Sequence, residues 1–404
     1  MRVLYVSKAS VVSAHRHKLA ELAKHVDVTL LVPKRWGRAA SEPRREQQAG
    51  ELPPGARYAV ERRPVLFDGR NHFHLYRGLG SVLTRGAFDL VHVDEEPYSL
   101  VTRQVGARAG ALGIPWLFFA WQNIDKRLPL PFRALREGVF HKASGGIAGG
   151  EEAASVLRIR GFEGPLAVIP QMGVDPELFR ADAPARREVR DELGVPERSF
   201  LAGYVGRLVP EKGVDLLVDA IPHVPGAHAL IVGSGPRRRA LERRASAAAA
   251  EARVHFAGDV PSLDVPRWIA ALDCLVLPSR TTQRWKEQFG RVLVEAMATG
   301  VPVVGSSSGE IPVVIGDAGR IFSEGDGRAL IGELRALAES PELRAELGRR
   351  GRERALARYT QEKIVLDTVS FYERIVPSSN RPASRVATLP GGVLRRADNV
   401  REAS

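Results

Sequence analysis

Short apolar runs alternate with helix-like segments along almost the whole chain, and this alternation restricts the fold more than any other feature. Runs such as residues 2–6, 116–120 and 274–278 are nearly unbroken by polar side chains. Strands buried on both faces of a parallel sheet have this pattern, whereas strands with one solvated face alternate apolar and polar residues. The helix-like segments between the runs predict a series of βα units. We therefore expect an α/β protein built from doubly wound parallel sheets.

The alternation is interrupted once and then begins again. Residues 171–199 are rich in proline and charge, and they are predicted to be a linker followed by a short helix. The 404 residues are enough for two domains of ordinary size, so the sequence predicts two similar α/β halves. Residues 35–64 are predicted to be a polar surface excursion of the first half. Residues 376–404 are predicted to be a disordered tail.

Composition places the chain among soluble globular proteins, with 44% hydrophobic and 26% charged residues. Its one cysteine, Cys274, lies in a strand-like run and is expected to be buried. A single cysteine excludes an internal disulfide framework, which predicts a reducing, cytoplasmic setting. The N-terminus lacks the apolar length of a signal peptide, and no apolar run approaches the roughly 20 residues that span a bilayer.

The net charge of +12 is concentrated in the first half. Residues 1–175 carry 25 basic against 17 acidic residues, whereas residues 176–375 carry 29 against 28. Such an excess attracts anionic partners, which include phosphorylated small molecules, an anionic membrane surface and nucleic acid. Solubility without any partner is the alternative interpretation, because charge alone is a weak signal.

The segment 203–215, "GYVGRLVPEKGVD", brings two cations to the end of a predicted strand. The strand ends at Gly206, and Arg207 and Lys212 precede a helix that begins near Gly213. Ligands of parallel sheets bind at the carboxyl ends of strands, and two cations beside a helix start suit a diphosphate. Two solvated surface cations remain the alternative.

Two glutamates mark the segment 287–304, "EQFGRVLVEAMATGVPVV". Glu287 is predicted to lie in the loop before a helix, and Glu295 lies within that helix among apolar residues. A carboxylate in apolar surroundings is costly unless it is hydrogen-bonded. Glu295 therefore either accepts from a polar ligand such as a ribose diol, or pairs with Arg291 one turn earlier on a solvated face.

Two further segments carry weaker signals. Residues 231–242 contain Gly-x-Gly without the third glycine of a dinucleotide loop, so a strand–turn–helix junction is the preferred interpretation. Asp94, Glu95 and Glu96 follow a strand, and clustered acids can bind a divalent ion. No Asp-x-Asp occurs in the chain, so a surface or acceptor-facing role is preferred and no metal site is predicted.

Four segments in order resemble the retaining GT-B glycosyltransferases of family 4, the glycogen-synthase-like group 1 glycosyltransferases. These segments are 168–179, 203–221, 258–279 and 287–322, the last with seven residues between its two glutamates. The resemblance extends over most of residues 1–375. It implies two Rossmann-like domains facing a cleft: residues 1–175 bind the acceptor and residues 176–359 bind the nucleotide sugar, while a helix at 360–375 crosses back to the first domain.

The resemblance also implies residue roles. Arg207 and Lys212 would bind and stabilise the leaving diphosphate, and Glu295 would accept from the ribose. The other implied contacts are grouped by the part of the donor they hold: Glu287, Gln288, Phe289 and Gly290 for the sugar, Gly206 for the phosphates, and the loop around Val260 for the base. Relatives often carry a histidine on the acceptor side, where this chain has Gln122 and Asn123; these are expected to replace its hydrogen bond.

The resulting prediction is a retaining transferase that moves a sugar from a nucleotide-diphosphate sugar to a sugar, lipid-linked or small-molecule acceptor in envelope or polysaccharide assembly. No cofactor or metal is expected besides the donor, and the enzyme is expected to be cytoplasmic, with peripheral contact to the anionic inner membrane face. One alternative is a nucleotide-sugar 2-epimerase on the same architecture. Another is a non-catalytic nucleotide or nucleic-acid binding protein; nucleic acid is not expected, because aromatics are only 6% and no basic–aromatic motif occurs.

Overall fold

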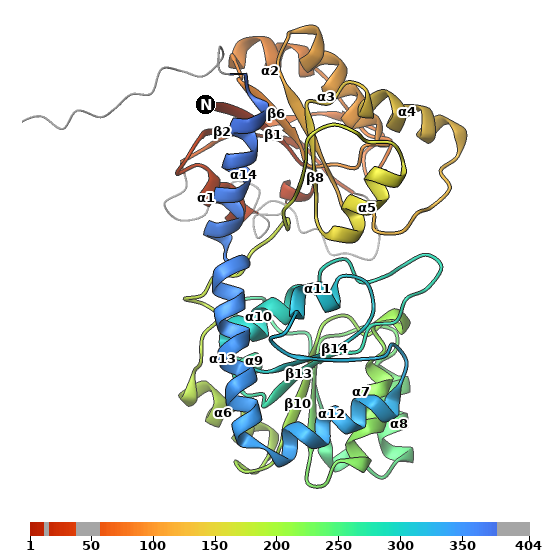
Figure 1. The fold of residues 1–404 in the computed structure, drawn as a ribbon, viewed down its shortest axis with the longest axis vertical. Coiled ribbons are helices and arrows are strands. Elements are labelled where there is room, and N and C mark those ends of the chain that lie inside the picture. Colours follow the sequence, from red (N-terminus) through yellow and green to blue (C-terminus); the bar gives the residue numbers. More distant parts are fainter. Residues whose placement is uncertain (12–15, 38–56, 378–404) are drawn as a thin grey trace, which may run out of the picture.

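The computed structural model describes residues 1–11, 16–37 and 57–377. They form two α/β lobes, one above the other in Figure 1, each built around its own parallel sheet. The first sheet has the strand order β3-β2-β1-β6-β7-β8-β9. Its strands are β1 (Arg2–Val6), β2 (Asp27–Pro33), β3 (Ala59–Arg63), β6 (Leu90–Val93), β7 (Trp116–Ala120), β8 (Gly145–Ala148) and β9 (Leu166–Val168). A short antiparallel pair, β4 (Val65–Leu66) and β5 (Leu75–Tyr76), lies outside this sheet.

The second sheet has the strand order β12-β11-β10-β13-β14-β15, with every neighbouring pair parallel. Its strands are β10 (Leu201–Val205), β11 (His228–Val232), β12 (Val254–Gly258), β13 (Cys274–Leu277), β14 (Val303–Ser306) and β15 (Arg320–Phe322). The chain reverses direction across the sheet between β10 and β13, and between β1 and β6 in the first sheet. Ligands of open parallel sheets bind at such reversal points.

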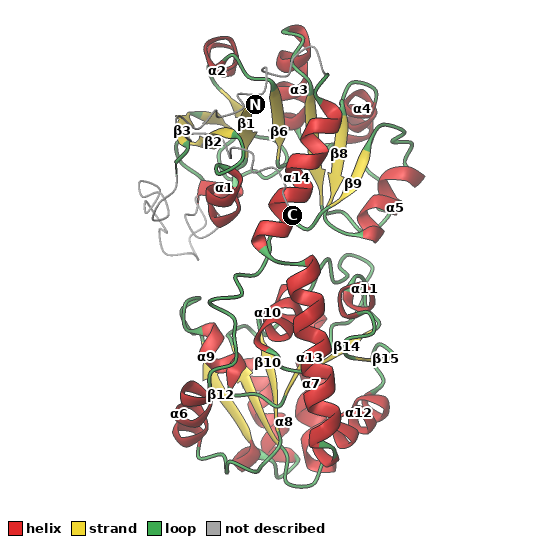
Figure 2. Ribbon diagram, turned by 60° about the vertical axis from the view of Figure 1, so that its left-hand side comes forward, coloured by secondary structure: helices red, strands yellow, loops and turns green. Residues whose placement is uncertain are grey.

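Helices cover both faces of each sheet, as Figure 2 shows. Those of the first lobe are α1 (His17–Leu22), α2 (Leu79–Gly86), α3 (Leu100–Ala111), α4 (Leu130–Phe140) and α5 (Glu151–Ile159). The remaining helices are α6 (Ala183–Leu193), α7 (Val214–Ala220), α8 (Arg238–Ala247), α9 (Val265–Ala270), α10 (Arg291–Thr299), α11 (Ile311–Ile315), α12 (Gly327–Glu339), α13 (Pro341–Arg358) and α14 (Gln361–Ile375). Because helices cover both faces, the central strands are fully buried, which explains their continuous apolar sequence. The predicted fold class is confirmed.

The chain passes between the lobes twice at one place. Val174 forms a β-bridge with Thr360, and Gly173 lies so close to Gln361 that a Cβ on Gly173 would be 2.5 Å from the Gln361 nitrogen. Before this crossing, α13 lies along the second lobe; beyond it, α14 lies along the first lobe (Figure 1). The Tyr372 hydroxyl of α14 is hydrogen-bonded to Nδ1 of His92 in β6 at 2.6 Å. The last helix therefore packs into the core of the N-terminal lobe.

Part of the predicted surface excursion is an edge strand. Residues 35–64 were expected to be a surface excursion, but Ala59–Arg63 form β3, an edge strand paired with β2. Its polar sequence fits an edge position, where one side of the strand meets solvent. Residues 38–56 and the predicted disordered tail from 378 onward lie outside the described residues. Among the residues described, no helix is long and apolar enough to cross a bilayer.

Candidate active site

The end of β10 carries the predicted phosphate-binding loop. Gly206 directly follows the strand with φ of 150°, and the Arg207 side chain is exposed to solvent. Lys212 ends a short 3-10 turn, Pro210–Lys212. Gly213 follows with φ of 62°, and a Cβ there would lie 2.0 Å from the carbonyl oxygen of Pro278. Only glycine fits between the two strand ends, and it keeps this loop close to the segment after β13.

Lys212 and Glu287 form a buried ion pair at this reversal point. The Lys212 Nζ lies 2.6 Å from Oε2 of Glu287, and their side chains are 15% and 8% exposed. The hydroxyl of Ser279, just after β13, donates to the same oxygen at 2.9 Å. Lys212 also lies over the ring of Trp285, 4.8 Å from its centre. Two residues predicted for separate parts of the donor are therefore joined directly, and Ser279 was not predicted, although it follows the strand end "LVLP".

For Glu295 the structure shows the ion pair with Arg291, but not the solvated face that this alternative predicted. Nε of Arg291 lies 2.7 Å from Oε1 of Glu295, so the i,i+4 ion pair forms. The carboxylate is nevertheless buried, with 8% of the residue exposed, whereas the Arg291 side chain is 54% exposed. Burial raises the pKa of Glu295, and Arg291 opposes that shift. The pair is therefore not a fully solvated surface pair, and Glu295 lies among core residues of α10.

The remaining residues predicted to bind the donor lie in loops that follow strands of the second sheet. Gly290 begins α10 with φ of 75°, and the buried Phe289 ring packs edge-on against Tyr359 at 5.7 Å. Val260, after β12, is half-buried against the core of the C-terminal lobe. The Gly-x-Gly segment after β11 is a strand–turn–helix junction, as predicted: a Cβ on Gly233 would lie 2.0 Å from the Gly206 carbonyl oxygen. Its glycines permit close contact between two loops.

Residues of the N-terminal lobe contact the segment 287–304, here called the signature segment. The Asn123 amide donates to the carbonyl oxygen of Glu287 at 2.9 Å, and the Gln288 amide donates to that of Trp121 at 2.9 Å. The Gln122 side chain instead donates to the carbonyl oxygen of Ile124, within its own loop. Of the two acceptor-side candidates, Asn123 is hydrogen-bonded to the C-terminal lobe, whereas the hydrogen bond of the Gln122 side chain stays within the N-terminal lobe.

Sequence reasoning missed a polar bridge between the lobes. A carboxylate oxygen of Glu310, beside α11, accepts from the Glu152 backbone nitrogen at the start of α5, at 2.6 Å. The Glu152 carboxylate is in turn paired with Lys286 and accepts from Asn123 at 3.1 Å. Gly309 permits this arrangement, since a Cβ there would lie 2.0 Å from the Glu287 carbonyl oxygen. No local signal marks these pairs, because their members are far apart in the sequence.

The acidic cluster after β6 is drawn inward, so the surface position, one of the two expectations for it, is wrong, while the acceptor-facing role stays a prediction. Asp94 accepts from the Ser7 hydroxyl at 2.8 Å and from the Gln171 amide at 2.6 Å, and Glu95 is paired with Lys8. Glu96 accepts from the backbone nitrogens of Trp121 and Gln122. Burial raises the pKa of Glu95 and of Glu96 to about 7. Within the described ranges, no three His, Cys, Asp or Glu residues are grouped so that they could hold a metal ion.

Lys18 in α1 is buried, and its amine has no hydrogen-bond partner among the described residues. Burial lowers its pKa from 10.5 to about 8, with Asp94 opposing the shift. The unfolded chain therefore binds more protons between pH 8 and 10.5, so stability should rise with pH across that window. We expect Lys18→Met to raise the free energy of unfolding at pH 7 by up to about 3 kcal/mol.

Thermal unfolding at pH 7 and pH 10 checks this, with the exposed Lys24→Met as the control. The advantage of Lys18→Met over the wild type should shrink at pH 10, while any effect of Lys24→Met should not change in the same direction. An advantage that is equal at both pH values would contradict a charged, desolvated amine as the cause.

Known proteins resemble this chain in sequence and in fold. Residues 185–354 match the family model described as "Glycosyl transferases group 1". The GDP-mannose-dependent alpha-(1-6)-phosphatidylinositol monomannoside mannosyltransferase of Mycolicibacterium smegmatis is 34% identical over 203 residues, 48% of this chain and 53% of that protein. The D-inositol 3-phosphate glycosyltransferase of Mycobacterium bovis is 32% identical over 173 residues, 41% of this chain and 34% of that protein. The chain thus matches about half of the first relative's length and a third of the second's.

Solved structures share the whole fold. The UDP complex of HepE from Anabaena aligns with a TM-score of 0.74 at 20% identity, covering 93% of this chain and 100% of that one. WaaG, described as a glycosyltransferase involved in lipopolysaccharide biosynthesis, aligns with a TM-score of 0.61 at 17% identity, covering 93% and 100%. The chain therefore has the GT-B fold of these structures, and its residues 185–354 are similar to the group 1 glycosyl transferases.

Proposed function

We propose that the protein transfers a sugar from a nucleotide-diphosphate sugar to a hydroxyl acceptor, with retention of configuration at the anomeric carbon. The observation that supports this best is the Lys212–Glu287 pair at the reversal point of the second sheet. It lies where the phosphate loop and the signature segment meet, and Asn123 of the other lobe contacts the same glutamate. A donor bound there would have its anomeric carbon facing the N-terminal lobe.

In this proposal the diphosphate binds the loop after β10. Arg207 is exposed and makes no ion pair within the part of the chain that the structure describes, so its guanidinium is available to a phosphate. Lys212 would divide its hydrogen bonds between Glu287 and the β-phosphate, because an ammonium group has three donors. As the bond to the anomeric carbon breaks, negative charge grows on the phosphate, and both cations stabilise it. They supply the electrostatic stabilisation, so the proposal requires no metal or other cofactor.

Glu287 and Glu295 would hold the two ends of the donor. The Glu287 carboxylate is fixed by Lys212 and Ser279, so it is preorganised to accept from sugar hydroxyls. Glu295 is fixed by Arg291 and would accept from the ribose diol with its remaining lone pairs. The backbone nitrogens of Gln288, Phe289 and Gly290, just before α10, would donate to sugar oxygens. Val260 would line the base site, and its neighbours would read the base through their backbone.

The acceptor and the setting are inferred from the relatives. One of them is named for GDP-mannose and a phosphatidylinositol monomannoside, and another for inositol 3-phosphate. We infer that this protein also acts in envelope or polysaccharide assembly, on a sugar, lipid-linked or small-molecule acceptor. The excess of basic residues in the first half supports work at the cytoplasmic side of an anionic membrane. NMR of the product's anomeric proton would test retention, and a product with inverted configuration would exclude it.

The donor site can be tested by thermal unfolding with UDP, GDP, ADP and dTDP, without added metal. A ligand that binds only the folded protein stabilises it by about 2.7 kcal/mol at a hundredfold excess over Kd. We expect one nucleotide to raise the Tm of the wild type and to raise that of Glu295→Ala much less. GDP would fit the mannosyltransferase relatives, whereas the HepE structure holds UDP.

Two controls make this result specific. Glu339→Ala removes an exposed carboxylate at the end of α12, away from the proposed site, and should leave the nucleotide shift unchanged. Glu295→Gln keeps the shape and part of the hydrogen bonding, so its shift should lie between those of the wild type and Glu295→Ala. An equal shift in all four proteins would remove Glu295 from the donor site, and no shift with any nucleotide would contradict the proposed site itself.

A further inference from the structure

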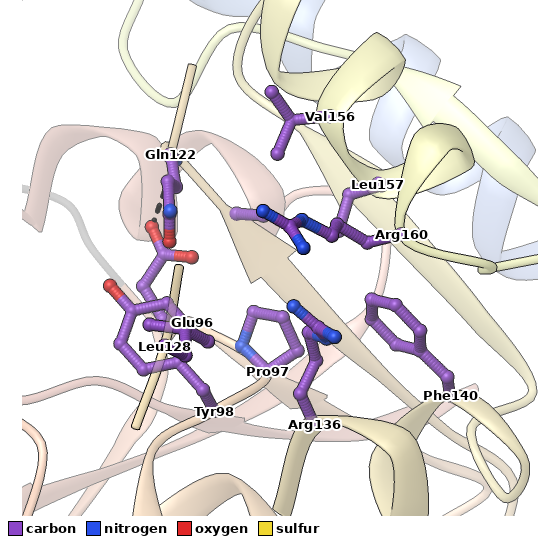
Figure 3. Close-up of a pocket in the computed structure, with 11 residues that line it drawn as sticks. Glu96, Pro97, Tyr98, Gln122, Leu128, Arg136, Phe140, Val156, Leu157 and Arg160 are labelled. Atoms are coloured by element: carbon purple, nitrogen blue, oxygen red, sulfur yellow. Dashed lines mark hydrogen bonds between the residues drawn. The ribbon is translucent and has the colours of Figure 1, made fainter. Parts of the chain in front are cut away.

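A small pocket in the N-terminal lobe contains two arginines that the proposed mechanism does not use. It lies between α4 and α5, beside the segments that follow β6 and β7 (Figure 3). Arg136 enters from α4 and Arg160 from the end of α5, and Figure 3 shows the two guanidinium groups side by side. The surrounding walls are apolar: Pro97, Leu128, Phe140, Val156 and Leu157.

Arg136 is the unusual member. Only 7% of the residue is exposed, its Nε has no hydrogen-bond partner, and no ion pair of its guanidinium is found among the described residues. Its contact is with the Phe140 ring, whose centre is 5.7 Å away. Burial and the charge of Arg160 lower the pKa of Arg136, and the more distant charges of Glu137 and Asp125 oppose that shift. A buried cation that forms no ion pair is costly, and charged residues are rarely buried unless they are paired.

The second arginine already has an anionic partner. Arg160 is paired with Asp125 and also donates to the Lys126 carbonyl oxygen at 3.3 Å. The acid that lines the pocket, Glu96, has one oxygen engaged by the backbone nitrogens of Trp121 and Gln122. Among the described residues, no hydrogen bond joins either carboxylate to Arg136, which is the unpaired cation of the pocket.

We propose that Arg136 and Arg160 form a subsite for an oxyanion, with phosphate as the best fit, carried by the acceptor substrate. The link to an acceptor rests on the proposed transferase function. Two guanidinium forks that come from two helices match a tetrahedral oxyanion, because each fork can donate two parallel hydrogen bonds. The apolar walls exclude water and strengthen those bonds.

The pocket is small in this structure. Its volume of about 20 Å³ holds about one water molecule, so a phosphate enters only if a wall side chain moves. Leu128 is the wall residue in the irregular segment before α4, where the neighbouring Lys126 and Arg127 are exposed. Movement of this segment would widen the pocket, and the same segment carries Asn123, which is hydrogen-bonded to the Glu287 carbonyl oxygen.

Isothermal titration calorimetry with the full chain tests the subsite. The two probes are inorganic phosphate and dioctanoyl phosphatidic acid below its micellar concentration. Arg136→Gln should weaken binding of both by about 10- to 100-fold. Arg133→Gln is the matched control, because Arg133 is on the same helix but exposed and paired with Glu137; it should stay within about twofold of the wild type. Arg207 is unchanged in the wild type and in all these variants, so any phosphate bound there adds equally to the binding measured for each.

The outcomes are distinct. Tighter binding of the lipid phosphate identifies an amphiphilic acceptor, and equal binding identifies a soluble phosphorylated one; both support the subsite. Failure of the wild type to bind either probe, or equal binding by Arg136→Gln, would overturn it. If Arg136→Gln does not fold, Arg160→Gln carries the same test from a more exposed position. The calorimetry uses no nucleotide. Loss of phosphate binding in Arg136→Gln would therefore support the subsite even if the separate nucleotide test of the donor site failed.

Discussion

Replacing Lys212 with methionine is expected to lower kcat by about a hundredfold to a thousandfold, the usual effect of removing one preorganised group that stabilises charge in a transition state. Lys212 is mostly buried and held 2.6 Å from Glu287, so its position needs no rearrangement when charge develops on the phosphate. Initial rates of nucleotide release from the donor, with and without acceptor, measure the effect. A variant with kcat within about threefold of the wild type would remove Lys212 from the mechanism.

Arg207→Met separates electrostatics from folding. Lys212→Met also leaves Glu287 without its cation, so it should lower Tm as well as kcat. Because Arg207 is exposed, its replacement by methionine should lower kcat/KM without changing Tm. Lys212→Arg keeps the charge and should retain more activity than Lys212→Met. If the activity losses followed Tm across the three variants, the proposed catalytic role of the cations would be wrong.

Asp273→Ala is expected to lower the free energy of unfolding by about 3–5 kcal/mol, the typical cost of removing one partner of a buried ion pair. The Asp273 carboxylate accepts from Arg190 and from Arg186, each at 2.6 Å, and from the Leu201 backbone nitrogen at 2.8 Å. The Arg190 side chain is only 2% exposed, so its charge would remain buried without a counter-ion. The change also removes a link between the beginnings of β10 and β13, the strands that carry the proposed donor site.

Chemical denaturation followed by tryptophan fluorescence measures this loss, because Trp268 and Trp285 both lie in the C-terminal lobe. Asp191→Ala is the control: Asp191 is exposed on α6, next to Arg190 in sequence, and its removal should cost no more than about 0.5 kcal/mol. Asp273→Asn tests whether charge or hydrogen bonding dominates. A loss below about 1 kcal/mol for Asp273→Ala would show that the backbone carbonyls around Arg190 suffice to hold it.

Within each lobe, the local sequence was sufficient to predict much of the architecture. Continuous apolar strands can be satisfied only in a sheet covered on both faces, so the two parallel sheets followed from the pattern. Gly206, after the end of β10, and Gly290, at the start of α10, lie where the sequence predicted a strand end and a helix start, and both take positive φ. The edge strand Ala59–Arg63 was missed because a strand with one solvated side lacks the continuous apolar run.

The sequence by itself determined the fold class and placed the cations and carboxylates at the strand ends, because both follow from local periodicity and from where parallel strands end. Only the tertiary structure decided how those groups are paired. It joined Lys212 to Glu287, paired the buried Glu295 with Arg291, brought Asn123 to Glu287 and, among the described residues, left Nε of Arg136 without a hydrogen-bond partner. Ion pairing and burial depend on distances between segments far apart in the chain, and no local pattern contains those distances.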